Sequence, residues 1–213
     1  MKSKLELVFD TLYNYFGPQH WWPGDSPWEI AVGAILTQQV AWSNVEKAIK
    51  TLKDNGVLDL KQILNADPDQ IKILIKPVGF YNQKATRLLG FASYVFKKYG
   101  NIETMLDRPT FDVREELLSI KGIGKETADS ILLYAGGHPV FVIDAYTNRL
   151  ARCLCISGVE DYNLLQAVFE SMIPKDVQIY NEYHALIVRL GKEHCRAKPM
   201  CYGCPVKQVK NII

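Results

Sequence analysis

The sequence predicts an all-α protein of two helical lobes, and three observations lead to this prediction. Apolar residues recur at helical spacing along most of the chain, for example at Ile179, Tyr183, Leu186 and Leu190. The breaks between such segments are short and rich in Gly, Pro and Asn. Only residues 140–143 (Val-Phe-Val-Ile) have the composition of a strand, and that run is too short and too isolated to found a sheet. We therefore expect roughly ten helices with short connections.

The clearest early helix is apolar on nearly all sides, so we expect it to be buried. It covers residues 28–36 and follows Ser26 and Pro27, an N-cap followed by a first-turn proline. The other expected helices, in chain order, cover residues 44–52, 81–99, 112–120, 127–135, 146–155, 163–172 and 176–191. The breaks fall at residues 54–56, 76–79, 99–101, 136–139 and 173–174.

Length and composition limit the class of protein. With 213 residues, 48% of them hydrophobic, the chain has enough apolar material for one large domain or two small ones. This excludes global disorder and a disulfide-stapled mini-protein. No apolar run has the length of a membrane span, and the N-terminus lacks the apolar core of a signal peptide. We therefore expect a soluble, cytoplasmic protein that does not bind membranes.

The overall charge leaves the partner undecided, because the net charge is only +2 and dedicated nucleic-acid domains are usually more basic. The five cysteines fall into two groups. Cys153 and Cys155 lie on an expected helix and are interpreted as small buried hydrophobic residues, whereas Cys195, Cys201 and Cys204 lie near the C-terminus. An odd number of cysteines without a secretory signal favours reduced thiols or a bound metal over a disulfide framework.

The most informative stretch is a glycine turn between two expected helices. Gly122 and Gly124 turn the chain, and a new helix begins near Thr127. Backbone amides in such a turn, together with the following helix N-terminus, form a site for an anion. A dinucleotide fingerprint would need glycine at Thr127, and a Walker loop would need glycine at Ser119 and Ser or Thr at Glu126. Neither motif is therefore present, which leaves an anion-binding hairpin or a plain helix–helix turn.

Asp144 follows the apolar run 140–143 and precedes an expected helix. Taken alone, an aspartate in this position is typical of a helix N-cap.

The hairpin, its spacing to Asp144 and the C-terminal cysteines together resemble the helix-hairpin-helix DNA glycosylases of the endonuclease III superfamily. The match runs from about Trp21 to Cys204. The resemblance implies that the hairpin grips a DNA phosphate and that Asp144 lies at the mouth of the base pocket, in a cleft between two lobes. It assigns the phosphate contact to Lys121, Gly122, Gly124 and Lys125. It implies a central bundle of residues 21–129 and a second lobe of residues 1–20 with 130–213, which includes a cysteine loop at 195–210.

One difference from this family concerns strand cleavage. Bifunctional members carry a hairpin lysine that attacks the sugar, and the matching position here, eighteen residues before Asp144, is Glu126. Lys125 is adjacent, but one residue on a helix rotates the side chain by about 100°. Without that amine no Schiff base forms, so we expect a monofunctional glycosylase without lyase activity. Glu126 is then a candidate for a hydrogen bond in the base pocket or for a solvent-facing position.

Several motifs resemble the endonuclease III-type 3-methyladenine DNA glycosylases. They are Trp-Trp-Pro at 21–23, Leu-Thr-Gln at 36–38, Gly-Phe-Tyr-Asn-Gln-Lys-Ala at 79–85 and Lys-Gly-Ile-Gly-Lys-Glu at 121–126. The resemblance assigns the flipped base to a pocket of Trp21, Trp22, Pro23 and Trp42. It makes Phe80, or its neighbour Tyr81, the wedge that enters the duplex, and Gln39, with Gln38 as its alternative, the residue that fills the vacated space. Core packing remains the alternative for each aromatic residue.

The C-terminal cysteines resemble the family's iron–sulfur loop but lack one member. Cys195, Cys201 and Cys204 are present, and family spacing places the fourth ligand at Lys210. A [4Fe–4S] cluster normally takes four thiolates. Three possibilities remain open: a cluster with another ligand such as His194, a zinc ion bound by His194 and the three thiolates, or no metal.

The resulting hypothesis is a monomeric DNA glycosylase of base excision repair that flips alkylated purines from damaged duplex DNA and hydrolyses their N-glycosidic bonds. One alternative is a glycosylase for oxidised, deaminated or mismatched bases. Another is a non-catalytic helix-hairpin-helix DNA-binding protein, although Asp144 and the tryptophans would then have no function in gripping phosphate.

Overall fold

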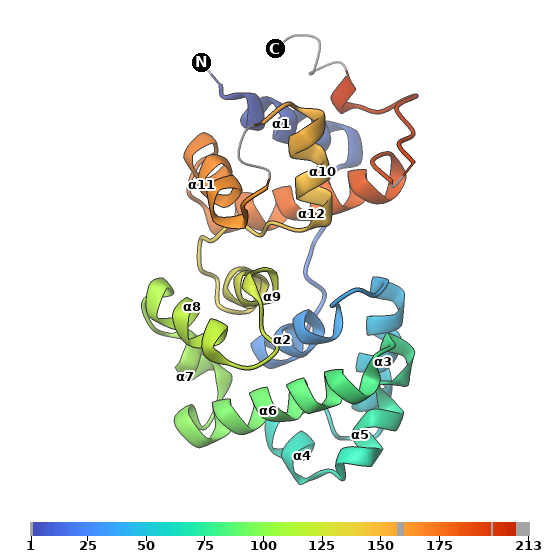
Figure 1. Cartoon of the computed structure of the whole chain (residues 1–213), viewed down its shortest axis with the longest axis vertical. Helices are drawn as coiled ribbons and strands as arrows, with labels where there is room; N and C mark the ends of the chain where they lie inside the picture. The colour runs from blue at the N-terminus through green and yellow to red at the C-terminus, as the bar shows by residue number, and fades with distance from the viewer. Residues whose placement is uncertain (1, 157–159, 197, 208–213) are drawn as a thin grey trace. The chain divides into compact units, whose positions relative to one another are not determined.

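The computed structural model describes residues 2–156, 160–196 and 198–207, and all regular secondary structure in these residues is helical. The all-α prediction is confirmed (Figure 1). The elements are α1 (Lys4–Phe16), α2 (Pro27–Leu36), α3 (Trp42–Asp54), α4 (Leu60–Asn65), α5 (Pro68–Leu74), η1 (Lys76–Val78), α6 (Tyr81–Tyr99), α7 (Ile102–Leu106), α8 (Thr110–Ser119), α9 (Lys125–Ser130), η2 (Ile131–Ala135), α10 (Ala145–Cys153), α11 (Tyr162–Met172) and α12 (Val177–Glu193). None of these helices is long and apolar enough to cross a membrane.

The chain divides into two compact units. Unit 1 consists of Met1–Trp22 and Pro139–Ile213, and unit 2 consists of Pro23–His138. The sequence led us to end the central bundle at residue 129, whereas residues 130–138 fall in unit 2. The reason is η2, a π-helical continuation of α9 that packs against α2.

The core of unit 2 surrounds α2, whose burial agrees with its apolar sequence. Ser26 accepts a hydrogen bond from the backbone N–H of Glu29 at 3.2 Å, so the N-cap signal read from the sequence starts the helix as expected. Trp28 is buried and stacks on Phe91 of α6, with 5.7 Å between ring centroids and 2° between planes. This contact joins α2 to α6, the longest helix of the unit (Figure 1).

The short helices α4, α5 and α7 were not anticipated, because five to seven residues are too few for a periodic pattern to show. The run 140–143 with strand composition is extended and buried but pairs with no strand among the described residues. Side chains of α11 take the place of a sheet: Glu170 accepts from the N–H of Phe141 at 2.8 Å, and Gln166 donates to its carbonyl at 2.7 Å.

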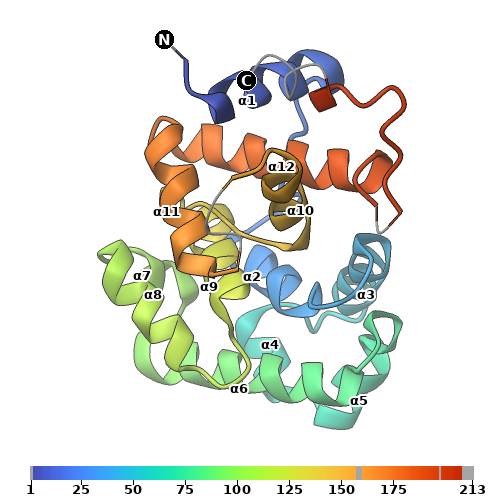
Figure 2. The same ribbon diagram turned by 45° about the horizontal axis from the view of Figure 1, so that its top comes forward.

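Unit 1 is built around α12, which packs against α1 and α10 (Figure 2). The hydroxyl of Tyr183 on α12 donates to the carbonyl of Leu5 on α1 at 2.9 Å. Gly191 lets α10 approach closely, because a Cβ at that position would lie 2.0 Å from Tyr146 Cδ1. These contacts fix α10 and its N-terminal residue Asp144 on the surface of α12.

Candidate active site

Asp144 is the N-cap of α10, as its position in the sequence indicated. Its Oδ1 accepts hydrogen bonds from the backbone N–H of Thr147 at 2.7 Å and from Thr147 Oγ1 at 2.9 Å. The buried segment 140–143 precedes it and fixes the entry of the chain. Capping occupies one carboxylate oxygen and leaves the other available, so a cap and a chemical function are compatible here.

The second oxygen of Asp144 faces a histidine. Nε2 of His184, a buried residue of α12, lies 3.6 Å from Oδ2 of Asp144. Burial opposes ionisation of Asp144, but the neighbouring His184 and the two bonds from Thr147 outweigh it, so the pKa of this carboxyl lies below its ordinary value of 3.8. Asp144 is therefore an anion at neutral pH, held in place by a helix N-terminus and an imidazole.

The glycine hairpin joins α8 to α9 as the sequence predicted. Gly122 has a φ of 93°, and a Cβ on it would lie 2.6 Å from Cγ of Arg87, so both conformation and space require glycine. Gly124 is the N-cap of α9, where no side chain caps the helix. Lys121 is exposed and Lys125 is half-buried. The turn thus places bare backbone at the start of α9, between two lysines.

The turn after α2 separates the two candidate glutamines. Gln39 is exposed and has a φ of 56°. Gln38 is half-buried, and its amide donates to the carbonyl of Gly122 at 3.1 Å and to Thr127 Oγ1 at 3.0 Å. Of the two glutamines, Gln39 is therefore the one exposed to solvent, whereas Gln38 bonds the hairpin within unit 2.

Phe80 immediately precedes α6, and its side chain is 68% exposed. Its φ of 44° follows directly on the positive φ of Gly79, so the chain turns sharply there. Tyr81, the alternative wedge, is the first residue of α6 and is half-buried. An exposed phenyl ring on a sharp turn has the form that a wedge requires.

The four candidate base-pocket residues are distributed over both units. Trp21 and Trp22, in unit 1, have ring centroids 5.2 Å apart and planes inclined by 53°. Pro23 and Trp42, in unit 2, line one cavity of about 420 Å³ together with the acidic side chain of Glu46. Within each unit the structure thus brings two of the four residues together.

Glu126 is the second residue of α9 and is exposed. The sequence left a pocket hydrogen bond and a solvent-facing position open, and both stay predictions. Glu126 thus presents an exposed carboxylate at the position to which the resemblance assigns the attacking amine of the bifunctional glycosylases.

The described part of the cysteine loop does not fit a four-thiolate cluster. Cys195 and Cys204 share a hydrogen bond that raises the pKa of Cys195 and lowers the pKa of Cys204 to about 6. No group of three or more Cys, His, Asp or Glu side chains is close enough to hold a metal among the residues described. His194 contacts the ring of Tyr15 and the carbonyl of Met200, and it also helps to lower the pKa of Cys204. Lys210 lies outside the described residues.

The other cysteines differ from expectation in part. Cys153 is half-buried, but Cys155 is exposed, with a φ of 54°. Cys155 follows the end of α10, and the turn there points it away from the core that the helical pattern implied.

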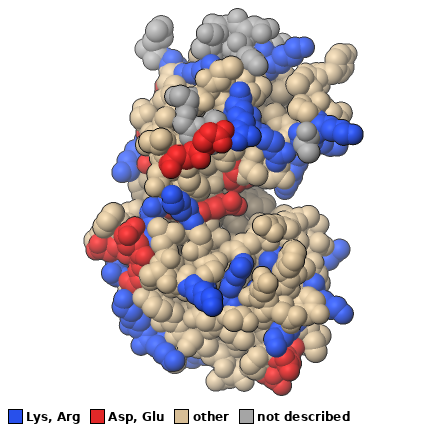
Figure 3. All heavy atoms as spheres, viewed as in Figure 1, with Lys and Arg blue, Asp and Glu red and all other residues tan. Residues whose placement is uncertain are grey.

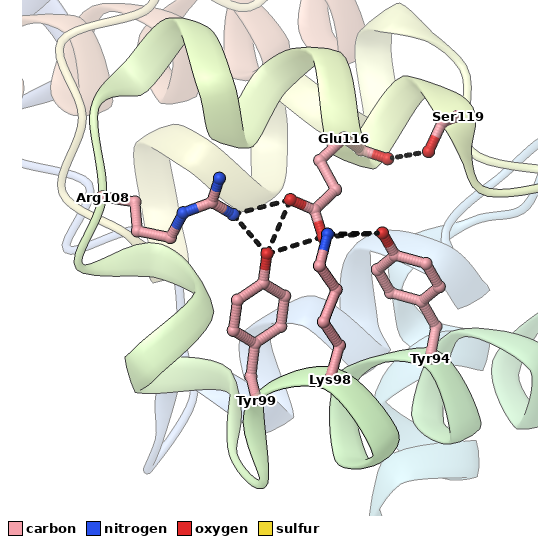
Figure 4. Close-up of polar contacts among 6 residues, drawn as sticks. All are labelled: Tyr94, Lys98, Tyr99, Arg108, Glu116 and Ser119. Atoms are coloured by element: carbon pink, nitrogen blue, oxygen red, sulfur yellow. Dashed lines mark hydrogen bonds and ion pairs between the residues drawn. The ribbon is translucent and has the colours of Figure 1, made fainter.

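A polar network anchors the first helix of the hairpin. Glu116 on α8 accepts hydrogen bonds from Tyr94 at 2.6 Å and from Lys98 at 2.8 Å, both on α6 (Figure 4). Its other oxygen accepts from Tyr99 at 2.6 Å and from Arg108 at 2.6 Å. Burial opposes the charge, but these donors together lower the pKa of Glu116 to about 2.

The sequence did not single out Arg87 and His184, nor Lys84, a buried lysine of α6 whose Nζ donates to the carbonyls of Leu36 and Val78. A signal existed for two of them, because Lys84 shares the apolar face of α6 with Leu88, and His184 adjoins the apolar stripe of α12. Side-chain charge gives no further guidance. Figure 3 shows both Lys and Arg and Asp and Glu side chains on the face viewed in Figure 1.

Comparison with known proteins decides the family. Residues 32–175 match the model of the HhH-GPD superfamily base excision DNA repair proteins. The chain belongs to this superfamily. A proposed DNA repair glycosylase of Methanocaldococcus jannaschii is 47% identical over 213 residues, which covers 97% of each chain. The predicted resemblance is thereby confirmed, and the chain is a DNA glycosylase of base excision repair.

Solved structures of HhH-GPD relatives agree with this assignment. The Helicobacter pylori 3-methyladenine DNA glycosylase, bound to 1,N6-ethenoadenine, is 30% identical, has a TM-score of 0.78, and is matched over 90% of this chain and 98% of that chain. An endonuclease III in a non-covalent complex with DNA has a TM-score of 0.81 at 21% identity, over 98% and 95% of the two chains. The second likeness concerns the fold alone.

Proposed function

We propose that this HhH-GPD glycosylase removes alkylated purines of the 3-methyladenine type from duplex DNA by hydrolysis and leaves the strand intact. The observation that carries the proposal is the ionised Asp144, with one oxygen fixed by Thr147 and the other beside His184. The likeness to the 3-methyladenine glycosylase supports the choice of base.

The chemistry assigned to Asp144 is electrostatic. As the N-glycosidic bond breaks, positive charge develops on the sugar, and a fixed carboxylate stabilises that charge. The same oxygen can orient a water for attack at C1′. An N3- or N7-alkylated purine is already a good leaving group because it carries positive charge. Little acid catalysis is therefore needed, and no side chain has to protonate the departing base.

The proposed base contacts are Trp21, Trp22, Pro23 and Trp42. An aromatic face attracts a cationic purine by about 2 kcal/mol when water is excluded. Stacking contributes roughly 1–3 kcal/mol per base. A neutral purine gains only the stacking part, so aromatic contacts favour the alkylated base over its normal counterpart.

Extrusion of the base is assigned to unit 2. Unstacking and unpairing cost a few kcal/mol. Phe80 would enter the duplex and Gln39 would fill the vacated space, since both are exposed on turns. The hairpin backbone at Gly122 and Gly124 would hold a phosphate of the same strand region.

Strand cleavage is not expected, because Glu126 occupies the position at which bifunctional glycosylases carry the attacking lysine. Lys125 precedes it by one residue on α9, which directs its side chain about 100° away. A carboxylate does not form a Schiff base with the sugar, so the product is an intact strand with an abasic site.

A panel of duplexes tests the proposal. Each duplex carries one lesion (3-methyladenine, ethenoadenine, an oxidised pyrimidine, uracil or a thymine mismatch), and abasic sites are scored after incubation. We expect the alkylated purines to be processed fastest. Faster processing of an oxidised, deaminated or mismatched base would contradict the substrate assignment, and no processing of any lesion would contradict glycosylase function.

A further inference from the structure

Three segments of unit 2 carry the residues proposed to meet DNA: the turn after α2, the turn before α6 and the hairpin before α9. Two of the exposed residues, Gln39 and Phe80, have positive φ values of 56° and 44° although neither is glycine. Such conformations are strained and persist where the surrounding structure holds them. Contacts elsewhere in unit 2 must therefore hold the turns that carry Gln39 and Phe80.

A buried ammonium joins the two turns. Lys84, on the first turns of α6, is 2% exposed, and its Nζ donates to the carbonyl of Leu36 at 2.8 Å and to the carbonyl of Val78 at 2.9 Å. Leu36 is the last residue of α2, three residues before Gln39, and Val78 is the last residue of η1, two before Phe80. Carbonyls at helix ends have no partner within the helix and favour a cation. The side chain of Lys84 therefore provides a hydrogen-bond donor to the last carbonyl of α2 and to the last carbonyl of η1.

The hairpin is tied to the same scaffold. Arg87, one turn after Lys84 on α6, lies against Gly122 and donates from Nη1 to Oε1 of Gln38. Gln38 in turn donates to the carbonyl of Gly122 and to the hydroxyl of Thr127. The turn after α2 is thus bonded to the turn before α6 through Lys84 and to the hairpin through Gln38.

Burying the charge of Lys84 lowers the stability of the fold, so folding stability does not explain why a lysine occupies this position. Burial, with a smaller contribution from the charge of Arg87, lowers the pKa of Lys84 to about 8. Lysine is almost never fully buried, because taking its charge out of water is costly. The long apolar stem of a methionine would fill similar space on the apolar face of α6 without a charge.

We propose that Lys84 is a positioning residue for base extrusion: by bonding the carbonyls of Leu36 and Val78 it holds Gln39 and Phe80 ready before DNA binds. This inference rests on the DNA-glycosylase function and deepens the part assigned to unit 2. Turns that are already ordered need not be ordered during extrusion. Loss of Lys84 therefore weakens binding to DNA with an extruded site more than binding to intact duplex, which depends on phosphate contacts.

The test compares Lys84→Met with Lys61→Met, an exposed lysine of α4 in the same unit. Two probes are used: a duplex with a tetrahydrofuran abasic analogue and the same duplex undamaged. The discrimination ratio is the affinity for the first divided by the affinity for the second. We expect Lys84→Met to lower this ratio at least tenfold, with undamaged-duplex affinity within twofold of wild type. Lys61→Met should leave the ratio within twofold.

A second arm asks whether Lys84 acts through the two turns. In a Gln39→Ala/Phe80→Ala background we expect the discrimination ratio to be low already, and adding Lys84→Met should lower it no further. If Lys84→Met lowers the discrimination ratio of the double variant as much as it lowers that of wild type, the proposal is overturned. An unchanged ratio in Lys84→Met alone would also overturn it. A parallel fall of both affinities would also overturn it, because that marks a general structural role.

Folding is checked by circular dichroism and thermal unfolding. If Lys84→Met does not fold, Lys84→Gln replaces it, since its amide can donate to one carbonyl, and the ratio should then fall at least threefold. Neither probe contains an alkylated base. If Lys84→Met leaves the discrimination ratio unchanged while the wild-type protein releases alkylated bases, only the positioning role of Lys84 is contradicted. If the ratio falls tenfold but the wild-type protein releases no alkylated base, only the substrate assignment is contradicted.

Discussion

Asp129 and Asp144 are both removed from bulk water, but their partners differ. Asp129, in α9 of unit 2, is fully buried, and Arg114 of α8 binds both its oxygens, with Nε at 2.6 Å from Oδ1 and Nη2 at 3.0 Å from Oδ2. Asp144, at the start of α10 in unit 1, has one oxygen on Thr147 and the other 3.6 Å from His184.

The difference shows which carboxylate is suited to chemistry. A guanidinium is always charged and binds a carboxylate with two parallel bonds, so the charge of Asp129 is neutralised permanently. The charge of Asp144 is stabilised by the backbone N–H and hydroxyl of Thr147 and by a single contact with His184 at 3.6 Å, without a bidentate guanidinium. Its negative charge therefore stays available to a sugar that becomes positive, whereas Asp129 holds α8 and α9 together.

The largest expected effect is on catalysis by Asp144→Asn. Asparagine is as good an N-cap as aspartate, so α10 should remain folded. The charge is lost, and base release should fall at least 100-fold at unchanged affinity for undamaged duplex. Single-turnover release measures the rate. A variant that retains more than a tenth of wild-type activity would show that the carboxylate is only a cap.

Asp129→Asn should affect stability instead. Removing the charge of one partner of a buried, bidentate pair weakens both of its bonds to Arg114, and the free energy of unfolding should fall by about 3 kcal/mol. Urea unfolding measures this change. The fraction that remains folded should release base at the wild-type rate. If Asp129→Asn abolishes release without loss of stability, the contrast between the two aspartates fails.

Glu116 extends the comparison to a carboxylate with several partners. Its pKa of about 2 lies below the ordinary 4.5, so the network contributes stability fully above pH 4.5 and loses that contribution as the pH falls toward 2. Glu116→Gln should lower the free energy of unfolding by about 2 kcal/mol at pH 7. The difference from wild type should shrink at pH 3. A difference that is independent of pH would mean that packing, and not charge, holds α8 to α6.

The smallest expected effect concerns His184. His184→Leu removes the imidazole that lies 3.6 Å from Asp144 Oδ2, and base release should slow about fivefold, equivalent to roughly 1 kcal/mol of lost electrostatic stabilisation. The loss should fall on kcat and leave KM unchanged. His184→Gln, whose amide can donate to the carboxylate, should restore most of the rate. Equal losses in both variants would indicate that the imidazole only fills space.

Much of this account was predictable from the sequence because local signals agreed. The cap at Ser26, the apolar run behind it and the two hairpin glycines each predicted the element that the structure contains. The partner of Asp144 was not predictable, because His184 is forty residues away and only the packing of α12 on α10 brings them together.

Lys84 illustrates a second limit. Its place on the apolar face of α6 was visible, but its two carbonyl partners depend on the ends of α2 and η1, which no periodic pattern specifies. The same holds for the choice between Gln38 and Gln39. Adjacent glutamines are equivalent in sequence, and only the turn directs one to Gly122 and leaves the other exposed.

The most direct test is chromatography of the bases set free when purified protein acts on methylated duplex DNA, with borohydride added to a parallel sample. The account predicts free 3-methyladenine, an intact strand and no protein–DNA adduct. A reaction that liberates no alkylated base, or that yields an abundant borohydride-trapped adduct, would contradict it.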